Sequence, residues 1–161
     1  MRCNKRHIFR IQHTKLNEKV GCRPSKSAKQ RFKEKLRKLT SRKIADTFEE
    51  IVKRINQTTV GWINYYGIAN MKAFIKEIQG WLNHRLRQLI LKRWKKPRTR
   101  YMKLRQYGID HEDAMKIANS RKGYWRLSRN EIIHRAITNE KLTKWGLKDL
   151  TQLYELRYLR D

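Results

Sequence analysis

Apolar residues recur three and four positions apart along much of this chain, which is the spacing that places them on one face of an α-helix. The clearest stripe predicts a helix that begins near Asp46 and ends at Gly67, and its members are Phe48, Ile51, Val52, Ile55, Thr59, Trp62 and Tyr66. Gly61 falls inside this helix, where glycine costs about 1 kcal/mol relative to alanine. We therefore expect a neighbouring element to pack closely against it.

Two further stripes predict helices on either side of this one. The first follows Pro24, ends near Thr40 and consists of Ala28, Phe32, Leu36 and Leu39. The second predicts a long helix over Met71–Lys95, which Pro97 ends, with an apolar line of Met71, Ile75, Ile78, Leu82, Leu86 and Leu89. A residue that precedes proline is pushed out of helical geometry, which supports an end at this point.

Shorter helices are predicted towards the C-terminus. One lies around Thr99–Tyr107 and stops at Gly108. Asp110 is expected to cap the next helix, which runs to Ala118. Gly123–Trp125 is expected to be a break between helices.

Capping patterns predict helices in the last third of the chain as well. Ser128 and Glu131 form a Ser-x-x-Glu capping box. Asn139 is expected to cap a helix that runs to Trp145 and is ended by Gly146. A last helix is predicted around Leu150, Leu153, Tyr154 and Leu156.

These patterns predict an all-α fold, in which a three-helix bundle is followed by a smaller helical region. Residues 24–108 are expected to form the bundle and residues 109–161 a helical C-terminal extension. Two interpretations of residues 1–23 stay open. The alternation over residues 7–12 favours a short strand, and the alternative is a segment without ordered structure.

Charge is concentrated in one part of the predicted bundle. The formal net charge is +27, and between Glu77 and Asp110 there is no acidic residue but ten basic ones: Arg85, Arg87, Lys92, Arg93, Lys95, Lys96, Arg98, Arg100, Lys103 and Arg105. Like charges this close repel one another, and nucleic acid is the commonest polyanion that removes the cost. We predict that these residues contact nucleic-acid phosphates, and the alternative is a solvated basic face.

Aromatic residues are interleaved with these cations. Tyr101 and Tyr107 are candidates to stack on splayed bases. Trp81 and Trp94 are expected in the core, because large aromatic side chains usually bury. A hydrophobic fraction of 39% is too high for a disordered basic tail.

Missing patterns exclude several classes of function. There is no glycine-rich phosphate loop, no Gly-x-Ser-x-Gly and no carboxylate pair for a two-metal site, so no catalytic residue and no cofactor is predicted. The spacing of Cys3, His7, His13 and Cys22 matches no usual zinc site, so no metal is predicted. No apolar stretch is long enough for a membrane span or a signal peptide, so we expect a cytoplasmic protein without a membrane partner.

Several segments resemble a known family. Residues 61–67 are similar to the Gly-Trp-x-Asn-Tyr-Tyr signature of the group II intron maturase-specific domain, with the signature positions at Gly61, Trp62, Tyr65, Tyr66 and Gly67. The segments that follow, residues 81–87 with Trp81 and residues 92–97 with Trp94, are similar to the same domain. Residues 123–128 and 145–147 resemble the C-terminal extension of bacterial members.

Members of this family are intron-encoded reverse transcriptases whose thumb, or domain X, is a helical bundle that grips intron RNA and assists its folding and splicing. The resemblance therefore implies an RNA-binding maturase domain whose partner is structured group II intron RNA. It does not imply polymerase activity, because the Tyr-x-Asp-Asp motif of the palm is absent. The chain resembles the C-terminal fragment of such a protein and is not expected to be an enzyme on its own.

Two other functions stay open. The chain resembles a thumb that could act as one subunit of a split reverse transcriptase, with a separately encoded palm as its partner. A basic helix can also enter the major groove of duplex DNA, which makes a DNA-binding helical domain the other alternative.

Overall fold

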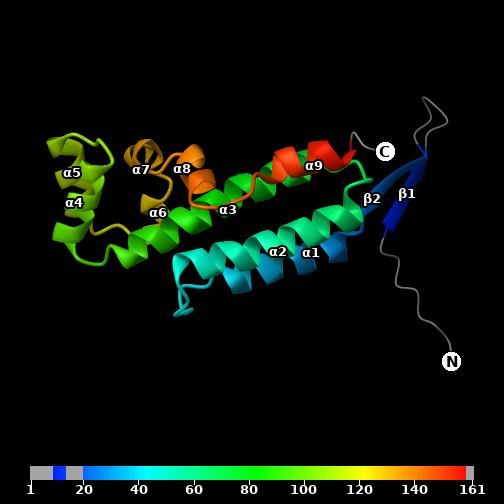
Figure 1. Ribbon diagram of the computed structural model, residues 1–161, viewed down its shortest axis with the longest axis horizontal. Coiled ribbons are helices and arrows are strands. Elements are labelled where there is room, and N and C mark those ends of the chain that lie inside the picture. Colours follow the sequence, from blue (N-terminus) through cyan, green and yellow to red (C-terminus); the bar gives the residue numbers. More distant parts are fainter. Residues whose placement is uncertain (1–8, 14–19, 159–161) are drawn as a thin grey trace. The chain divides into compact units, whose positions relative to one another are not determined.

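The computed structural model describes residues 9–13 and 20–158 of the chain. Helices account for most of these residues, so the predicted all-α fold is confirmed. The elements of the described ranges, labelled in Figure 1, are β1 (Phe9–His13), β2 (Val20–Pro24), α1 (Lys26–Leu39), α2 (Phe48–Tyr66), α3 (Lys72–Arg93), α4 (Pro97–Gln106), α5 (His111–Ala118), α6 (Tyr124–Leu127), α7 (Glu131–Ala136), α8 (Asn139–Lys144) and α9 (Leu150–Tyr158). None of these helices is both long and apolar enough to cross a membrane.

The N-terminal strands form an antiparallel pair. Phe9 lies opposite Pro24, and His13 lies opposite Val20. The strand predicted over residues 7–12 is found from Phe9 onward, while residues 7 and 8 lie outside the described residues. The partner strand β2 is not predicted, because it contains a glycine and a proline, both of which are unfavourable in strands.

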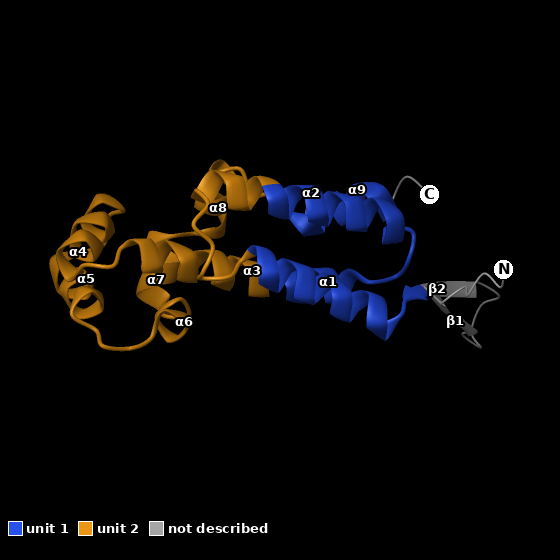
Figure 2. Ribbon diagram, turned by 90° about the horizontal axis from the view of Figure 1, so that it is seen from below, with its two compact units in different colours: residues 1–39, 54–79, 148–161 blue, residues 40–53, 80–147 orange. Residues whose placement is uncertain are grey.

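One compact unit consists of residues 1–39, 54–79 and 148–161, drawn in blue in Figure 2. Its aromatic centre is the stack of Phe32 on Trp62, with ring centroids 4.4 Å apart and an interplanar angle of 14°. The buried hydroxyl of Tyr154 accepts a hydrogen bond from the Met71 N–H at 3.1 Å and donates one to the Ala69 carbonyl at 2.9 Å. Both backbone groups are thereby satisfied inside the core.

The second compact unit consists of residues 40–53 and 80–147, drawn in orange in Figure 2. Its core contains side chains from the start of α2 and from α3 to α8, and its large buried side chains include Leu86, Leu91, Leu104, Leu127, Ile133 and Ile137. Within this unit α4 and α5 pack against each other. The chain turns between them at Gly108, whose φ of +84° lies in the left-handed region that favours glycine.

The start of α2 lies slightly later than predicted, because Thr47 and not Asp46 caps it. The Thr47 hydroxyl oxygen accepts a hydrogen bond from the Glu50 N–H at 3.3 Å, and the Glu50 carboxylate accepts one from the Thr47 N–H at 2.9 Å. This is a reciprocal capping box, which satisfies two N–H groups that the first turn leaves without helical partners.

Two predicted caps are wrong. Asn130, not Ser128, caps α7, and the Ser128 hydroxyl instead donates to the Trp125 carbonyl at 2.7 Å. Thr138, not Asn139, caps α8. In both places two polar residues with capping ability lie close together in the sequence, and the helix begins at the one whose backbone is extended.

Other predicted ends give mixed results. Asp110 caps α5 as predicted, its carboxylate accepting the Asp113 N–H at 3.0 Å. Gly146 follows α8 as predicted, with φ of +96°. The predicted break at Gly123–Trp125 is wrong, because Tyr124–Leu127 forms the single-turn helix α6.

Candidate nucleic-acid interface

The predicted basic segment contains the end of one helix and the start of another. α3 ends at Arg93, and Lys96 already serves as the N-cap of α4 with an extended backbone (φ −81°, ψ 139°). Pro97 takes the first position of α4, where its fixed φ fits the helix and its missing N–H leaves no bond unmade. Only residues 94–96 separate the two helices, so their terminal cations are held close together.

Five of the ten predicted RNA-binding residues are exposed at this junction, and we call them the α3–α4 basic surface: Lys92, Arg93, Lys95, Lys96 and Arg98. Two of them are held by the loop before α2. The Lys92 ammonium donates to the Arg42 carbonyl, and the Arg93 guanidinium donates to the Asp46 carbonyl at 2.7 Å. These bonds hold the charged ends of both side chains beside the loop, and both residues remain exposed.

The loop adds a further cation that the sequence did not single out. A pocket of about 280 Å³ is lined by residues of the loop, α2 and α3: Arg42, Ile44, Ala45, Asp46, Thr47, Ile51, Leu89, Lys92 and Arg93. Arg42, which lines this pocket, is exposed, and so is Lys43, the next residue in the sequence. The only signal that could have indicated this contribution is the pair of basic residues just before the capping box.

The other three members of the α3–α4 basic surface lack an acidic partner within the part of the chain that the structure describes. Lys95, Lys96 and Arg98 form no ion pair with any residue that the structure describes. Lys96 and Arg98 also lie at the N-terminus of α4, where the helix dipole disfavours positive charge, and the first turn of α4 contains no acidic residue. The electrostatic energy of both positive charges at this position is therefore unfavourable. A bound anion would make it favourable.

Arg87 is not available for the predicted phosphate contact, because only 3% of it is exposed. Its guanidinium donates to the Ile137 carbonyl and to the Asn139 side-chain oxygen, both at 2.8 Å. Burial lowers the pKa of the Arg87 guanidinium below its usual range. This arginine stabilises the fold by pairing with oxygens that α3 and the segment around α8 bury together.

Arg100 is likewise buried, with 6% exposed. It donates to the carbonyls of Ile117 and Ala118 at 3.3 and 3.2 Å, and both carbonyls lie at the C-terminus of α5. The Ile117 carbonyl also accepts the Ser120 N–H at 3.2 Å. A cation at this end of a helix is also favoured by the helix dipole. The prediction that Arg100 contacts RNA is therefore replaced by a structural function.

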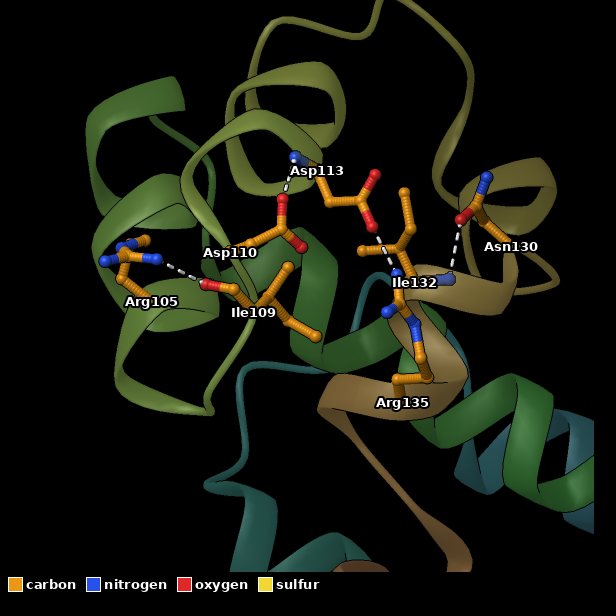
Figure 3. A network of polar contacts seen from close by, with 7 residues as sticks. All are labelled: Arg105, Ile109, Asp110, Asp113, Asn130, Ile132 and Arg135. Atoms are coloured by element: carbon orange, nitrogen blue, oxygen red, sulfur yellow. Dashed lines mark hydrogen bonds and ion pairs between the residues drawn. The ribbon is translucent and has the colours of Figure 1, made fainter.

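The remaining three predicted cations each donate a hydrogen bond to another residue of the protein. Arg85 is half-buried over the Trp81 ring at 5.6 Å and donates to the Thr40 carbonyl at 2.9 Å. Arg105 is exposed, but its guanidinium donates to the Ile109 carbonyl at 2.9 Å, as Figure 3 shows. Half-buried Lys103 donates to the Gln106 side chain at 3.2 Å on the same helix.

Asp110 and Asp113, which follow the basic segment, both form contacts that stabilise the fold. Figure 3 shows the Asp110 carboxylate accepting the N–H of Asp113, whose own carboxylate forms an ion pair with Arg135. The Asp113 N–H is the main cause that lowers the pKa of Asp110. No group of three or more potential metal ligands occurs among the described residues.

The aromatic residues near the junction are mostly packed. Trp94 is buried as predicted and lies 5.8 Å from Tyr107, while half-buried Tyr101 hydrogen-bonds to His111 at 2.9 Å. A hollow of about 450 Å³ opens beside them, lined by Phe48, Glu49, Ile90, Arg93, Trp94, Tyr107, Lys144, Trp145 and Gly146. Lys144 and Trp145 come from a distant part of the sequence, which is why no local pattern connects them to this surface.

The signature residues lie in the other unit, on α2 and just after it. Trp62 and Tyr66 have ring centroids 4.6 Å apart, which agrees with the packing function expected for them. Gly67 does not end the helix by a left-handed backbone, because its φ is not positive. Instead, a Cβ there would lie 2.5 Å from both the Ile63 carbonyl oxygen and an Arg157 side-chain carbon. Close approach explains this glycine.

Comparison with protein families gives one match to this region of the chain. Residues 29–108 match the family described as the group II intron, maturase-specific domain. The matched range includes α2, α3, α4 and every residue of the α3–α4 basic surface. No curated protein matches the chain.

Proposed function

We propose that this chain, whose residues 29–108 belong to the group II intron maturase-specific domain family, binds group II intron RNA and assists its folding and splicing. The observation that carries the proposal is the α3–α4 basic surface. Lys96 and Arg98 lie at a helix N-terminus that disfavours cations, and they have no acidic partner among the described residues. A phosphate chain supplies the missing negative charge.

Binding would assist RNA folding by selecting compact RNA conformations. A folded intron brings phosphates close together, and their mutual repulsion opposes the compact state. Lysine and arginine side chains that neutralise those phosphates bind the compact RNA better than the open one and so shift its population. The arginines can also hold a phosphate with two hydrogen bonds, which adds geometric preference to the charge.

Splicing in vitro tests the proposal directly. A group II intron transcript would be incubated at a magnesium concentration at which it splices slowly alone, with and without the protein. The expected result is faster splicing with the protein and a smaller effect with a variant in which Lys95, Lys96 and Arg98 are glutamine. Equal splicing rates with and without the protein, at concentrations that saturate RNA binding, would refute the proposal.

Two additional assays distinguish the alternatives. In a competition experiment, the protein is first bound to a labelled intron RNA fragment. At equal salt concentration, unlabelled structured intron RNA should displace this fragment at a lower concentration than duplex DNA does. Better competition by the duplex would favour a DNA-binding domain. In a primer-extension assay, addition of a candidate palm chain should produce no synthesis if the chain acts as a maturase domain alone, whereas synthesis that requires both chains would favour a split polymerase.

A further inference from the structure

A second basic and aromatic surface occurs in the unit formed by residues 1–39, 54–79 and 148–161. It is a groove of about 400 Å³ between α1 and α2, which we call the Gly61 groove. Its lining residues are Ala28, Arg31, Phe32, Lys35, Gln57, Thr58, Gly61, Trp62, Tyr65 and Tyr66. A volume of this size lies within the range of about 300–1,000 Å³ that is usual for pockets that hold small organic groups.

Gly61 has no packing partner among the described residues that would explain it. It lies in the interior of α2 and is exposed, and a Cβ built on it meets no atom of those residues within 4 Å. The close packing expected from the sequence is therefore not found. Glycine in such a position costs about 1 kcal/mol relative to alanine, and a common reason to keep it is that a ligand approaches the backbone closely.

Aromatic rings form one wall of the groove, and part of their surface stays accessible. Trp62 is held by its stack on Phe32, yet it is only half-buried and lines the groove. Tyr65 is 54% exposed, and its ring meets the Tyr66 ring edge-on with centroids 4.7 Å apart. Rings fixed in this way offer a rigid surface on which a planar group can stack.

The charge of the groove determines the kind of occupant. α1 carries seven basic residues and the single acidic residue Glu34. Arg31 and Lys35 are exposed at the groove and form no ion pair with a described residue. An occupant that has both a planar face and a negative charge therefore complements this surface, and the amide of Gln57 and the hydroxyl of Thr58 add hydrogen-bonding groups.

We propose that the Gly61 groove binds an unpaired nucleotide of single-stranded RNA, with the base against the aromatic wall and the adjacent phosphates at Arg31 and Lys35. Bases in a duplex cannot stack on side chains, whereas bases of loops and single strands do so. The inference rests on the proposed RNA-binding function. It adds a second contact for single-stranded RNA, separate from the phosphate contacts of the α3–α4 basic surface.

The glycine itself supplies the test. In Gly61→Leu the new side chain would occupy the groove. Gly80→Leu is a matched control, because Gly80 is also an exposed helical glycine whose added Cβ would meet no atom of the described ranges within 4 Å. Both variants should be at least as heat-stable as the wild type, because leucine favours helix over glycine. The probe is a single-stranded oligoribonucleotide that contains one 2-aminopurine, whose fluorescence falls when the base stacks.

The expected result is that the wild type and Gly80→Leu quench the probe and bind it equally, whereas Gly61→Leu binds it about tenfold more weakly with little quenching. A Tyr65→Ala variant should also reduce quenching, and it serves as the second test if Gly61→Leu does not fold. Equal binding and quenching by Gly61→Leu and Gly80→Leu would overturn the groove while leaving the proposed function intact. Failure of the wild type to bind any RNA would overturn both.

Discussion

Replacing Lys95, Lys96 and Arg98 by glutamine should weaken RNA binding without weakening the fold. The three side chains are exposed and form no ion pair with a described residue, so none of the changes should destabilise the protein by more than about 0.5 kcal/mol. Lys96 and Arg98 oppose the dipole of α4, and the removal of each charge should stabilise the protein by roughly 0.3–1 kcal/mol. The unfolding temperature should therefore stay constant or rise.

The effect on RNA binding can be worked out from counterion release. Each phosphate contact adds about 0.7–0.9 to the slope of log affinity against log salt concentration, so loss of three contacts should lower that slope by roughly 2–3. Between 50 and 200 mM salt each contact changes affinity by about threefold. Over this range the fold-loss of affinity of the variant should therefore be smaller than that of the wild type by a factor of roughly 20 to 40.

Fluorescence anisotropy with a labelled group II intron fragment, measured at several KCl concentrations, gives both slopes. The matched control replaces Lys116, Arg121 and Lys122 by glutamine, because these are also two lysines and one arginine that are exposed in the same unit. Equal slopes for the wild type and the junction variant would refute the reasoning. So would an equal change in the control, because charge in general and not the α3–α4 basic surface would then set the affinity.

Three further predictions follow from buried or crowded groups. Arg87→Ala should lower the free energy of unfolding by about 2–4 kcal/mol, because it leaves the Ile137 carbonyl unpaired and creates a cavity. Thermal unfolding measures this change. An unchanged unfolding temperature together with lost RNA binding would show instead that Arg87 contacts phosphate. Burial is the main cause that lowers the pKa of His84 and His134 below 6.5. The folded state then binds fewer protons than the unfolded chain, so stability should be fully present above pH 6.5 and decrease as the pH falls below it. Unfolding temperatures measured between pH 8 and 5 test this at roughly half-unit steps, and a temperature that does not fall on acidification would contradict it. Gly67→Ala should lower the unfolding temperature, because the new Cβ would lie 2.5 Å from two atoms. Gly61→Ala should instead stabilise the protein by about 1 kcal/mol, because alanine favours helix over glycine. A lower unfolding temperature for both variants would contradict an open groove at Gly61.

Much of the fold could be predicted because its signals are local. The stripe of α2, the Asp110 cap and the turns at Gly108 and Gly146 each depend on residues within a few positions of one another. The wrong caps show the limit of such signals. Ser128 can form the hydrogen bond of a cap as well as Asn130 can, and the choice depends on backbone geometry that the fold as a whole imposes.

The candidate site was predictable in charge but not in exposure. In the sequence Arg87 and Lys95 are equivalent members of one basic run. Arg87 is buried because the Ile137 carbonyl, 50 residues further along the chain, lies within reach of its guanidinium. Arg42 joins the surface for the same kind of reason, since Lys92 donates to its carbonyl across 50 residues. Contacts at such separation leave no periodic trace in the sequence.

The buried members of the basic run share one type of side chain, although Arg93, Arg98 and Arg105 are exposed. The two cations that the fold buries are arginines, and each uses its planar, multiply donating guanidinium to satisfy two oxygens at once. A lysine ammonium also has three N–H donors, but it is more strongly hydrated than a guanidinium, and the lysines of the run stay at the surface or half-buried. The helix dipole accounts for Lys92 and Arg93 in the last turn of α3, but it opposes Lys96 and Arg98. The residues without an internal reason for their charge are therefore the ones on which RNA binding should depend.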